Sequence, residues 1–507
     1  MQSSSRIAAS GGGHGRSGRA SDLAFTALTL VVVGIRARAL SHAGAPPGFD
    51  GGDWLALGRG LLGDAVRPSG IGAAPVAPLL TYASFSIAGT FAFVALGAVL
   101  SIAPGVGAYA MLRRAVPPWP AAMFAAFLIG VAASGEAASW GGYPQLLGLG
   151  LLPPVLLMVE GALRADRVRS ALTAGVGLLA IAFTSDFVFV LTAAAAGLLV
   201  LMRICFRGPS AVSIKPIAVS LVAMAAPLVL AVPLYARIIA TRVAAVTSPP
   251  EAFGDVQPGL RSRVDALWFD SRLIWWFLVP VGFAGLLRLR GRTGDPHWRV
   301  AGALLVPAVA FVVVFPEPRL AYFVPSAVII AAGLWSDSVS RRHGLAQLFL
   351  GVVACCLVVQ LVAMPDTAQR QARRYQALTP GLVAGIEWLR EESPRRSVVV
   401  VTAYRDAPPL GWWVEGLGRR RTLTASSPKW VHFESEKVAA ARAARVLSAG
   451  VPTARTLDIA RRFGADFVFI DKRWSEFVPA RVTALAREVR GVVAFENASV
   501  VILRARR

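Results

Sequence analysis

Residues 345–364, LAQLFLGVVACCLVVQLVAM, form an apolar run without a charged residue, and the following PDTAQRQARR (365–374) carries four. A helix that crosses the hydrocarbon layer of a bilayer, roughly 30 Å thick, needs about 20 mostly apolar residues. The run has that length, and the chain changes from apolar to charged where it ends. This boundary predicts a membrane domain followed by a water-exposed domain.

The composition of the whole chain is typical of a membrane protein. Its 507 residues are 55% hydrophobic and 16% charged, whereas a soluble domain carries about a quarter charged residues. The formal net charge of +23 comes largely from arginines that stand in short connectors between apolar runs. Membrane topology places basic residues there, so we expect no nucleic-acid partner.

Eleven apolar runs are candidates for transmembrane segments. Backbone polar groups in lipid must be paired within their own segment, so each run is expected to be a helix. The sequence therefore predicts a mostly α membrane protein with about eleven transmembrane helices. Two runs meet at Thr184-Ser185-Asp186 and form either two short helices or one broken helix. The expected spans are 22–40, 86–112, 118–134, 144–163, 170–184, 187–204, 216–236, 272–288, 300–315, 320–336 and 345–364.

The arginines in the connectors predict the orientation in the membrane. Basic residues fall in alternate connectors, for example Arg113 and Arg114 in one and Arg341 and Arg342 in another. The positive-inside rule makes these connectors cytoplasmic. With an odd number of spans, the N-terminus lies inside and the C-terminal domain outside. We expect three segments: a disordered tail at 1–21, a transmembrane domain at 22–364 with an outer loop at 41–85, and an extracytoplasmic domain at 365–507.

The C-terminal segment has the pattern of a small α/β domain. SVVVVT (397–402) and DFVFID (466–471) are short β-branched or aromatic runs that predict buried strands. The residues at 492–495 and 499–503 predict a pair of hairpin strands, and helical patterns stand between the strands. Alternating strands and helices indicate a small sheet flanked by helices.

Charged and aromatic residues on the outer side are the candidates for chemistry, because charges at the membrane surface are costly and often functional. The first outer loop reads GFDGGDW (48–54) and carries Asp50 and Asp53; Asp53 can alternatively be the N-cap of a helix that starts at Trp54. The turn at 315–323 holds the one basic residue of the short outer turns, Arg319, and guanidinium binds phosphate well. The candidate substrate-binding residues are Arg319, Glu317, Glu136, Tyr143, Asp186 and Tyr322.

At these residues the chain resembles the GT-C superfamily of membrane glycosyltransferases. Those enzymes have many spans, an acidic motif in the first outer loop, and often a C-terminal outer domain. Asp50 and Asp53 in FDGGDW stand where that family has its acidic motif, although two glycines separate them here. FPEPRLAYFVP (315–325) is similar to the acidic-Arg-aromatic turn of several GT-C branches.

The resemblance implies a specific reaction. The enzyme would move a hexose or pentose from a polyprenyl-phosphate donor to a glycan, lipid or protein on the outer face of a bacterial plasma membrane, with inversion. One acid, Asp50 or otherwise Asp53, would be the general base, and Arg319 would hold the departing phosphate. No cofactor is required; a divalent metal occurs in some branches, and Asp50, Asp53 and Glu136 are the only nearby acids, so we assign no metal ligands.

Two other classes of function stay open on the sequence alone. One is a transporter or flippase of a lipid-linked solute, although no internal repeat of the kind common in that class is evident. The other is a non-catalytic membrane scaffold whose C-terminal domain binds a partner in the cell envelope. Retained activity after Asp50→Asn would favour the scaffold.

Overall fold

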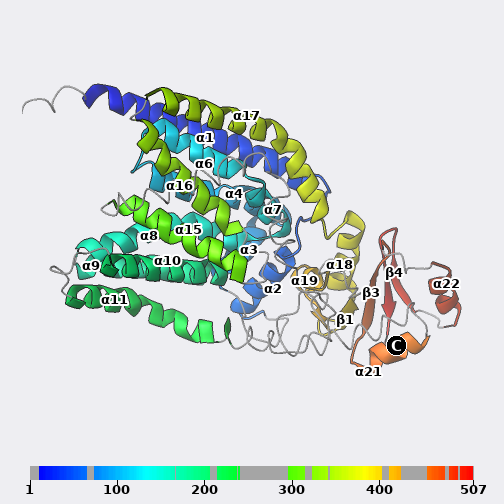
Figure 1. The fold of residues 1–507 in the computed structure, drawn as a ribbon. Coiled ribbons are helices and arrows are strands. Elements are labelled where there is room, and N and C mark those ends of the chain that lie inside the picture. The colour runs from blue at the N-terminus through cyan, green and yellow to red at the C-terminus, as the bar shows by residue number, and fades with distance from the viewer. Residues whose placement is uncertain are drawn as a thin grey trace, which may run out of the picture.

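The computed structural model describes residues 11–64, 74–165, 167–205, 214–236, 238–239, 295–314, 322–340, 343–401, 410–423, 454–473, 479–488 and 492–505. These residues form a bundle of helices with a small sheet at one end (Figure 1). The expected mostly α protein with a small C-terminal sheet is therefore confirmed.

Among the described residues, seven helices are long and apolar enough to cross a membrane. The bent pair α6 and α7, with an angle of 43° between them, makes an eighth if it counts as one span. The seven are α1 (Gly11–Ser41), α4 with α5 (Phe91–Leu100 and Ala103–Leu112), α8 (Tyr143–Ala165), α10 (Asp186–Cys205), α11 (Ile214–Leu228, continued by the turn η1 at Val229–Ala231), α15 (Pro296–Val314) and α17 (His343–Arg374). The pair is α6 (Pro118–Gly130) and α7 (Ala132–Trp140), and shorter apolar helices are α3 (Val76–Ala88), α9 (Val168–Thr184) and α16 (Phe323–Ser340).

Ten of the eleven expected spans overlap helices, and the eleventh, 272–288, lies outside the described residues. The count of eleven thus stays a prediction. The last helix does not end at the expected boundary, since α17 continues through Pro365 to Arg374. At the other end of the chain, α1 begins at Gly11.

The break at Ser185 separates two helices. Ser185 has extended backbone angles (φ −155°, ψ 122°), and its hydroxyl accepts the amide N–H of Val188 at 3.4 Å. An N-cap serine satisfies one of the unpaired amides at a helix start, so α10 begins independently of α9. Of the two readings of the sequence, the structure has two helices.

Small residues let the membrane helices approach each other closely. A Cβ added at Gly107 of α5 would collide with the carbonyl of Gly150 on α8, and one at Gly150 would lie 2.8 Å from the carbonyl oxygen of Ala103. Such contacts favour association in lipid, where helices gain little from the hydrophobic effect. Glu160 of α8, fully buried, is held by Arg164 at 2.8 Å and by Arg299 of α15 at 2.5 Å.

The C-terminal part, from Pro380 onward, is a five-stranded sheet flanked by helices; we call it the sheet domain. The strand order is β2-β1-β3-β5-β4, with β1 parallel to β2 and β3, and β5 antiparallel to β3 and β4. All residues of β3 are buried, as expected for a central strand. The described elements of the sheet domain are α18 (Pro380–Glu392), β1 (Val398–Val401), α19 (Leu410–Gly416), β2 (Arg421–Thr422), α21 (Ala454–Arg462), β3 (Phe467–Asp471), α22 (Pro479–Glu488), β4 (Val493–Glu496) and β5 (Val500–Arg504).

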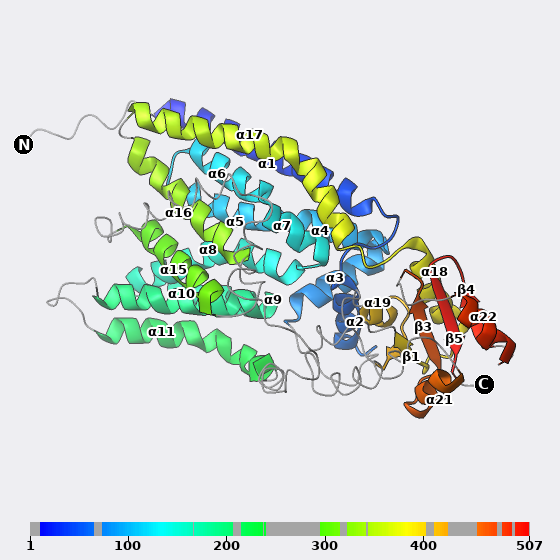
Figure 2. The ribbon, with the colours of Figure 1, turned by 45° about the vertical axis from the view of Figure 1, so that its right-hand side comes forward.

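The sheet domain is joined to the helical bundle through α2 (Gly51–Leu61), which lies beside α19 (Figures 1 and 2). One apolar cluster continues across the junction: Leu55 and Phe93 pack with Leu382 and Phe469 of the sheet domain. The start of α1 and the sheet domain lie at opposite ends of the molecule (Figure 2). The residues at 45–55 contact both the bundle and the sheet domain.

Candidate active site

Asp50 stands at the junction between the first outer loop and α2. It occupies the N-cap position of α2, but its side chain makes no capping hydrogen bond, and the residue is only 4% exposed. Asp53 lies in the first turn of the helix and is half-buried. The expectation that Asp53 is the N-cap is therefore wrong: the glycines already belong to the helix, which begins three residues earlier than the sequence suggested.

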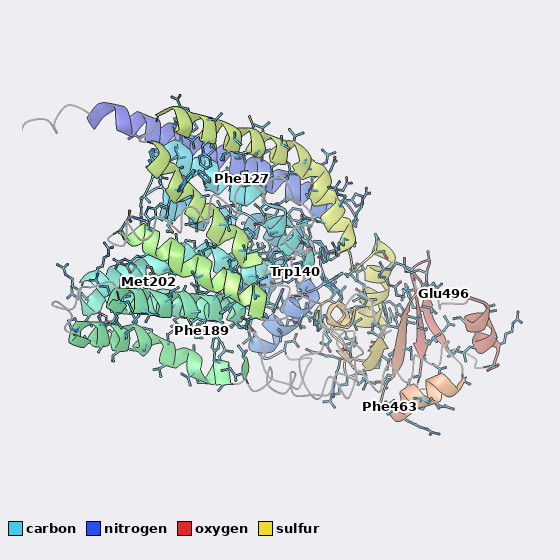
Figure 3. All side chains as sticks on the ribbon, viewed as in Figure 1. Phe127, Trp140, Phe189, Met202, Phe463 and Glu496 are labelled. Carbon is cyan, nitrogen blue, oxygen red and sulfur yellow. The ribbon has the colours of Figure 1, made fainter. Side chains whose placement is uncertain are left out.

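The segment before Asp50 is fixed to the end of α7. The carbonyl oxygen of Trp140 accepts the amide N–H groups of Phe49 (2.9 Å) and Asp50 (3.0 Å). In return, the Trp54 indole N–H donates to the carbonyl oxygen of Gly141 at 2.7 Å. These bonds join the start of α2 to the end of α7, two segments that are far apart in the sequence, and Glu136, which the sequence placed in a short turn, lies within α7. Trp140 lies at the end of the bundle that faces the sheet domain (Figure 3).

Gly141 allows this close approach. Its φ of +96° lies in the left-handed region that favours glycine, and a Cβ there would come within 3.3 Å of the Asp50 Cβ. Any other residue would be strained and would push the Asp50 side chain away.

Glu136 reaches the same region from α7. Its carboxylate accepts a hydrogen bond from the Tyr375 hydroxyl, just beyond the end of α17. The Tyr375 ring packs edge-on against Phe49, with 5.3 Å between the ring centroids. Tyr375 thus contacts both Glu136 and Phe49, the residue that precedes Asp50.

Tyrosines complete the apolar side of the site. Tyr143 is buried, donates its hydroxyl to the carbonyl oxygen of Phe93 at 3.1 Å, and interacts electrostatically with Asp50. The Tyr322 hydroxyl accepts from the Trp140 indole N–H at 3.4 Å. Trp54, Trp140 and Tyr143 belong to one apolar cluster, against which Tyr322 packs.

Three other candidate residues from the sequence are considered separately from this group of contacts: Glu317, Arg319 and Asp186. Glu317 and Arg319 lie outside the described residues. Asp186 begins α10, two residues before Val188, whose side chain is 3.0 Å from the position of a Cβ on Gly148 in α8. It thus starts a helix that packs on the helix headed by Tyr143, and it interacts electrostatically with Tyr235.

This arrangement offers two carboxylates in a largely apolar, partly buried environment. A buried carboxylate with few competing donors is suited to accept a proton from a hydroxyl at hydrogen-bond distance. Among the residues that the structure describes, no three His, Cys, Asp or Glu side chains gather as a metal site would require. Sequence reasoning did not single out Tyr375, which stands eleven residues beyond the end of the predicted last span; only the structure, in which α17 continues to Arg374, places it at a helix end.

No protein-family profile matches the sequence, and no curated protein matches it. Solved structures do resemble the fold. ArnT from Cupriavidus metallidurans in the apo state has 15% identity and a TM-score of 0.59, over 96% of this chain and 98% of ArnT. The same protein bound to undecaprenyl phosphate has 16% identity and a TM-score of 0.58, with the same coverage. The fold of this chain is therefore similar to that of ArnT over nearly the whole length of both chains, which agrees with the fold that the sequence resemblance implies.

Proposed function

We propose that this chain is a membrane glycosyltransferase that moves a sugar from a polyprenyl-phosphate donor to an acceptor on the outer face of the membrane. The observation that carries the proposal is the buried Asp50, fixed to the Glu136-bearing turn in a GT-C fold. Support for the donor class comes from ArnT, which has been solved with undecaprenyl phosphate bound.

In the proposed reaction, the acceptor hydroxyl attacks the anomeric carbon of the donor sugar. Asp50 takes the hydroxyl proton while the bond between the anomeric carbon and the phosphate oxygen breaks, and polyprenyl phosphate leaves with the bonding electrons. A single displacement inverts the anomeric configuration. Asp53, one turn further along α2, is the alternative base. Whichever carboxylate lies nearer to the acceptor oxygen accepts the proton.

In this proposal, the candidate residues other than Asp50 and Asp53 bind the substrates. Arg319 would bind the departing phosphate, whose negative charge grows as the bond breaks. In the sequence it stands three positions before Tyr322, whose hydroxyl contacts Trp140. Glu317, Glu136, Tyr143, Tyr322 and Asp186 would contact the sugar or acceptor, and we propose that no metal is required.

The proposed orientation follows from the arginines. With eleven spans, the N-terminus would be cytoplasmic and the sheet domain extracytoplasmic. The start of α1 lies at the end of the bundle opposite the sheet domain (Figure 2), which supports this orientation. The acceptor would then belong to the cell envelope, and the transferred sugar would be a hexose or a pentose.

The test is analysis of the cell-envelope glycans of a deletion strain by mass spectrometry. The strain is complemented with wild type, Asp50→Asn, Asp53→Asn or the control Asp64→Asn, whose carboxylate is exposed and paired with Arg395 at 2.8 Å. Wild type and Asp64→Asn should restore a missing sugar, and Asp50→Asn should not. Full restoration by both Asp50→Asn and Asp53→Asn would reject the glycosyltransferase and favour the scaffold.

A second measurement separates a transferase from a protein that has no lipid substrate. Purified full-length protein in detergent is titrated with undecaprenyl phosphate, and tryptophan fluorescence reports binding. Saturable binding by both wild type and Asp50→Asn is expected, because the base acts on the acceptor and not on the phosphate. Absence of binding by wild type would contradict the proposed donor class.

A further inference from the structure

The short helix α19 of the sheet domain is packed directly against the acidic end of α2. A Cβ added at Gly52 would lie 2.7 Å from the backbone of Trp412 and Trp413. A Cβ at Gly416 would collide with the carbonyl oxygen of Gly52, and the Gly416 carbonyl accepts a hydrogen bond from the buried guanidinium of Arg59. The backbones of the two helices therefore touch at the glycines between the two acids.

Trp413 extends this contact to the loop before Asp50. The residue is fully buried, and its indole N–H donates to the carbonyl oxygen of Gly48 at 3.3 Å. Its ring lies 2.9 Å from the position of a Cβ on Gly51 and packs edge-on against Phe93, at 5.0 Å between centroids. The sheet domain thus contacts residues on both sides of Asp50.

The connector that follows α17 holds the same loop from another direction. The Gln376 side-chain amide donates to the carbonyl oxygen of Pro46 at 3.2 Å, and Tyr375 packs against Phe49. Ala45 shares an apolar cluster with Ala377 and Leu378. Residues 42–50 form neither helix nor strand, so these contacts define much of their path.

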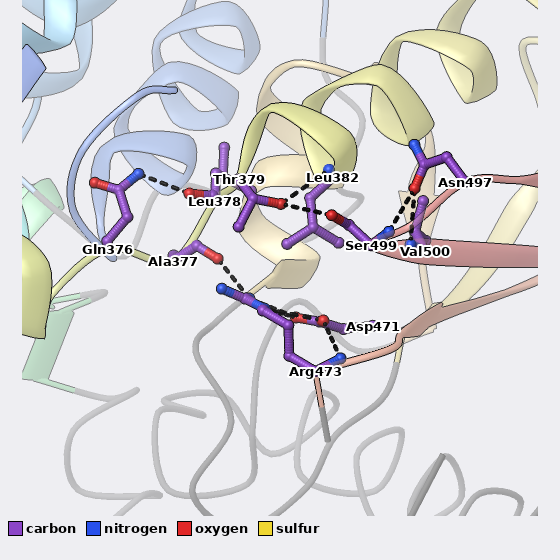
Figure 4. A network of polar contacts seen from close by, with 10 residues as sticks. All are labelled: Gln376, Ala377, Leu378, Thr379, Leu382, Asp471, Arg473, Asn497, Ser499 and Val500. Atoms are coloured by element: carbon purple, nitrogen blue, oxygen red, sulfur yellow. Dashed lines mark hydrogen bonds and ion pairs between the residues drawn. The ribbon is translucent and has the colours of Figure 1, made fainter. Parts of the chain in front are cut away.

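The connector is in turn fixed to the sheet (Figure 4). Arg473, paired with the fully buried Asp471 at the end of β3, donates to the carbonyl oxygen of Ala377 at 2.8 Å. The Thr379 hydroxyl donates to that of Ser499 at 3.2 Å. The connector is therefore bonded to the sheet domain at two points.

We propose that the sheet domain serves as a clamp that positions Asp50 for catalysis, with Trp413 and Gln376 as its positioning residues. The inference deepens the proposed function and rests on it for the catalytic consequence. A loop without regular structure samples many conformations, and a displacement of about 1 Å at a reacting group can lower a rate on the order of a hundredfold. The clamp restricts the loop to one path.

The first test of the clamp does not depend on activity. Hydrogen exchange, read by mass spectrometry, follows the peptide 45–55, which contains the Phe49 and Asp50 amides bonded to Trp140. In full-length protein, Trp413→Phe removes the bond to Gly48, and the matched control Trp388→Phe alters a tryptophan that packs on Phe467 and Phe495 inside the sheet domain. We expect exchange in 45–55 to be about tenfold faster in Trp413→Phe only, with strand β3 unchanged in both.

A second variant covers the case in which Trp413→Phe does not fold. Gln376→Met keeps the length of the side chain and removes the bond to Pro46, and it should also accelerate exchange in 45–55. Unchanged exchange in this peptide, in whichever of the two variants fold, overturns the clamp.

The catalytic arm uses the complemented deletion strain and undecaprenyl phosphate as the binding probe. For Trp413→Phe we expect envelope product at matched protein level to fall tenfold or more, while the Kd for undecaprenyl phosphate stays within about twofold of wild type. Faster exchange with undiminished product would reject the positioning role. Faster exchange in a protein whose wild type makes no product would reject the glycosyltransferase and leave the clamp standing.

Discussion

Replacement of Gly52 by alanine tests the closest backbone contact in the candidate site. The Cβ of alanine would lie 2.7 Å from the carbonyl carbon of Trp412 and the amide nitrogen of Trp413, and 2.8 Å from the Trp412 carbonyl oxygen. Ordinary contact begins near 3.4 Å, so α2 and α19 would have to separate by about 0.7 Å. Backbone atoms cannot rotate away, in contrast to the end of a side chain.

The size of the effect follows from this overlap. Overpacking of a well-packed contact costs about 1–3 kcal/mol. At about 1.4 kcal/mol for each factor of ten, the population with α19 seated on α2 falls between roughly 5- and 140-fold. If the seated arrangement holds Asp50 in its productive position, the rate of product formation falls by a similar factor.

Two other glycines serve as comparisons. At Gly51 the added Cβ meets ring carbons of Trp413 (2.9 Å) and Phe93 (3.0 Å), which can shift slightly, so Gly51→Ala should be milder. At Gly34 in α1 nothing lies within 4 Å, so Gly34→Ala should resemble wild type. The assay measures envelope glycan product at matched protein level, together with thermal unfolding by tryptophan fluorescence. Equal product and equal Tm for Gly52→Ala and Gly34→Ala would refute the reasoning.

Four further predictions can be tested with the same protein. Arg299→Leu removes one partner of the fully buried Glu160 and should destabilise by about 3–5 kcal/mol, and Glu160→Leu in the same chain should restore much of the Tm. Arg36→Met removes the donor that bonds the carbonyls of Ser101 and Ile129 at 3.0 and 2.6 Å. The free energy of unfolding should fall by about 1–3 kcal/mol for each carbonyl, and an unchanged Tm would contradict this. Tyr375→Phe keeps the packing on Phe49 but removes the hydroxyl from Glu136, so product should fall by about tenfold while Tm changes little. The hydrogen bond from the His297 side chain holds the pKa of Asp295 below its usual value. The stability that the ionised Asp295 contributes is therefore present above about pH 4 and is lost as the pH falls below that value. Thermal scans from pH 6 to 3 should show a smaller decrease in Tm for Asp295→Asn than for wild type.

Properties that are encoded locally could be predicted from the sequence. Apolar runs of about 20 residues gave ten segments that overlap helices, because lipid forces each segment to pair its own backbone groups. The strands at Val398–Val401 and Phe467–Asp471 followed from short β-branched and aromatic runs. The exact helix start before Asp53 was missed, because Gly51-Gly52 resembles a loop in the sequence, whereas in the structure it is helical and packs against α19.

The sequence by itself determined which apolar segments are long enough to span a membrane, where the sheet lies, and which few acids stand near the ends of the helices. Only the tertiary structure decided which of them meet. Asp50 is fixed by Trp140, 90 residues away, and its loop by Trp413, which is 365 residues from Gly48. Contacts over such separations leave no periodic pattern in the chain, because they depend on how whole helices and domains pack rather than on neighbouring residues.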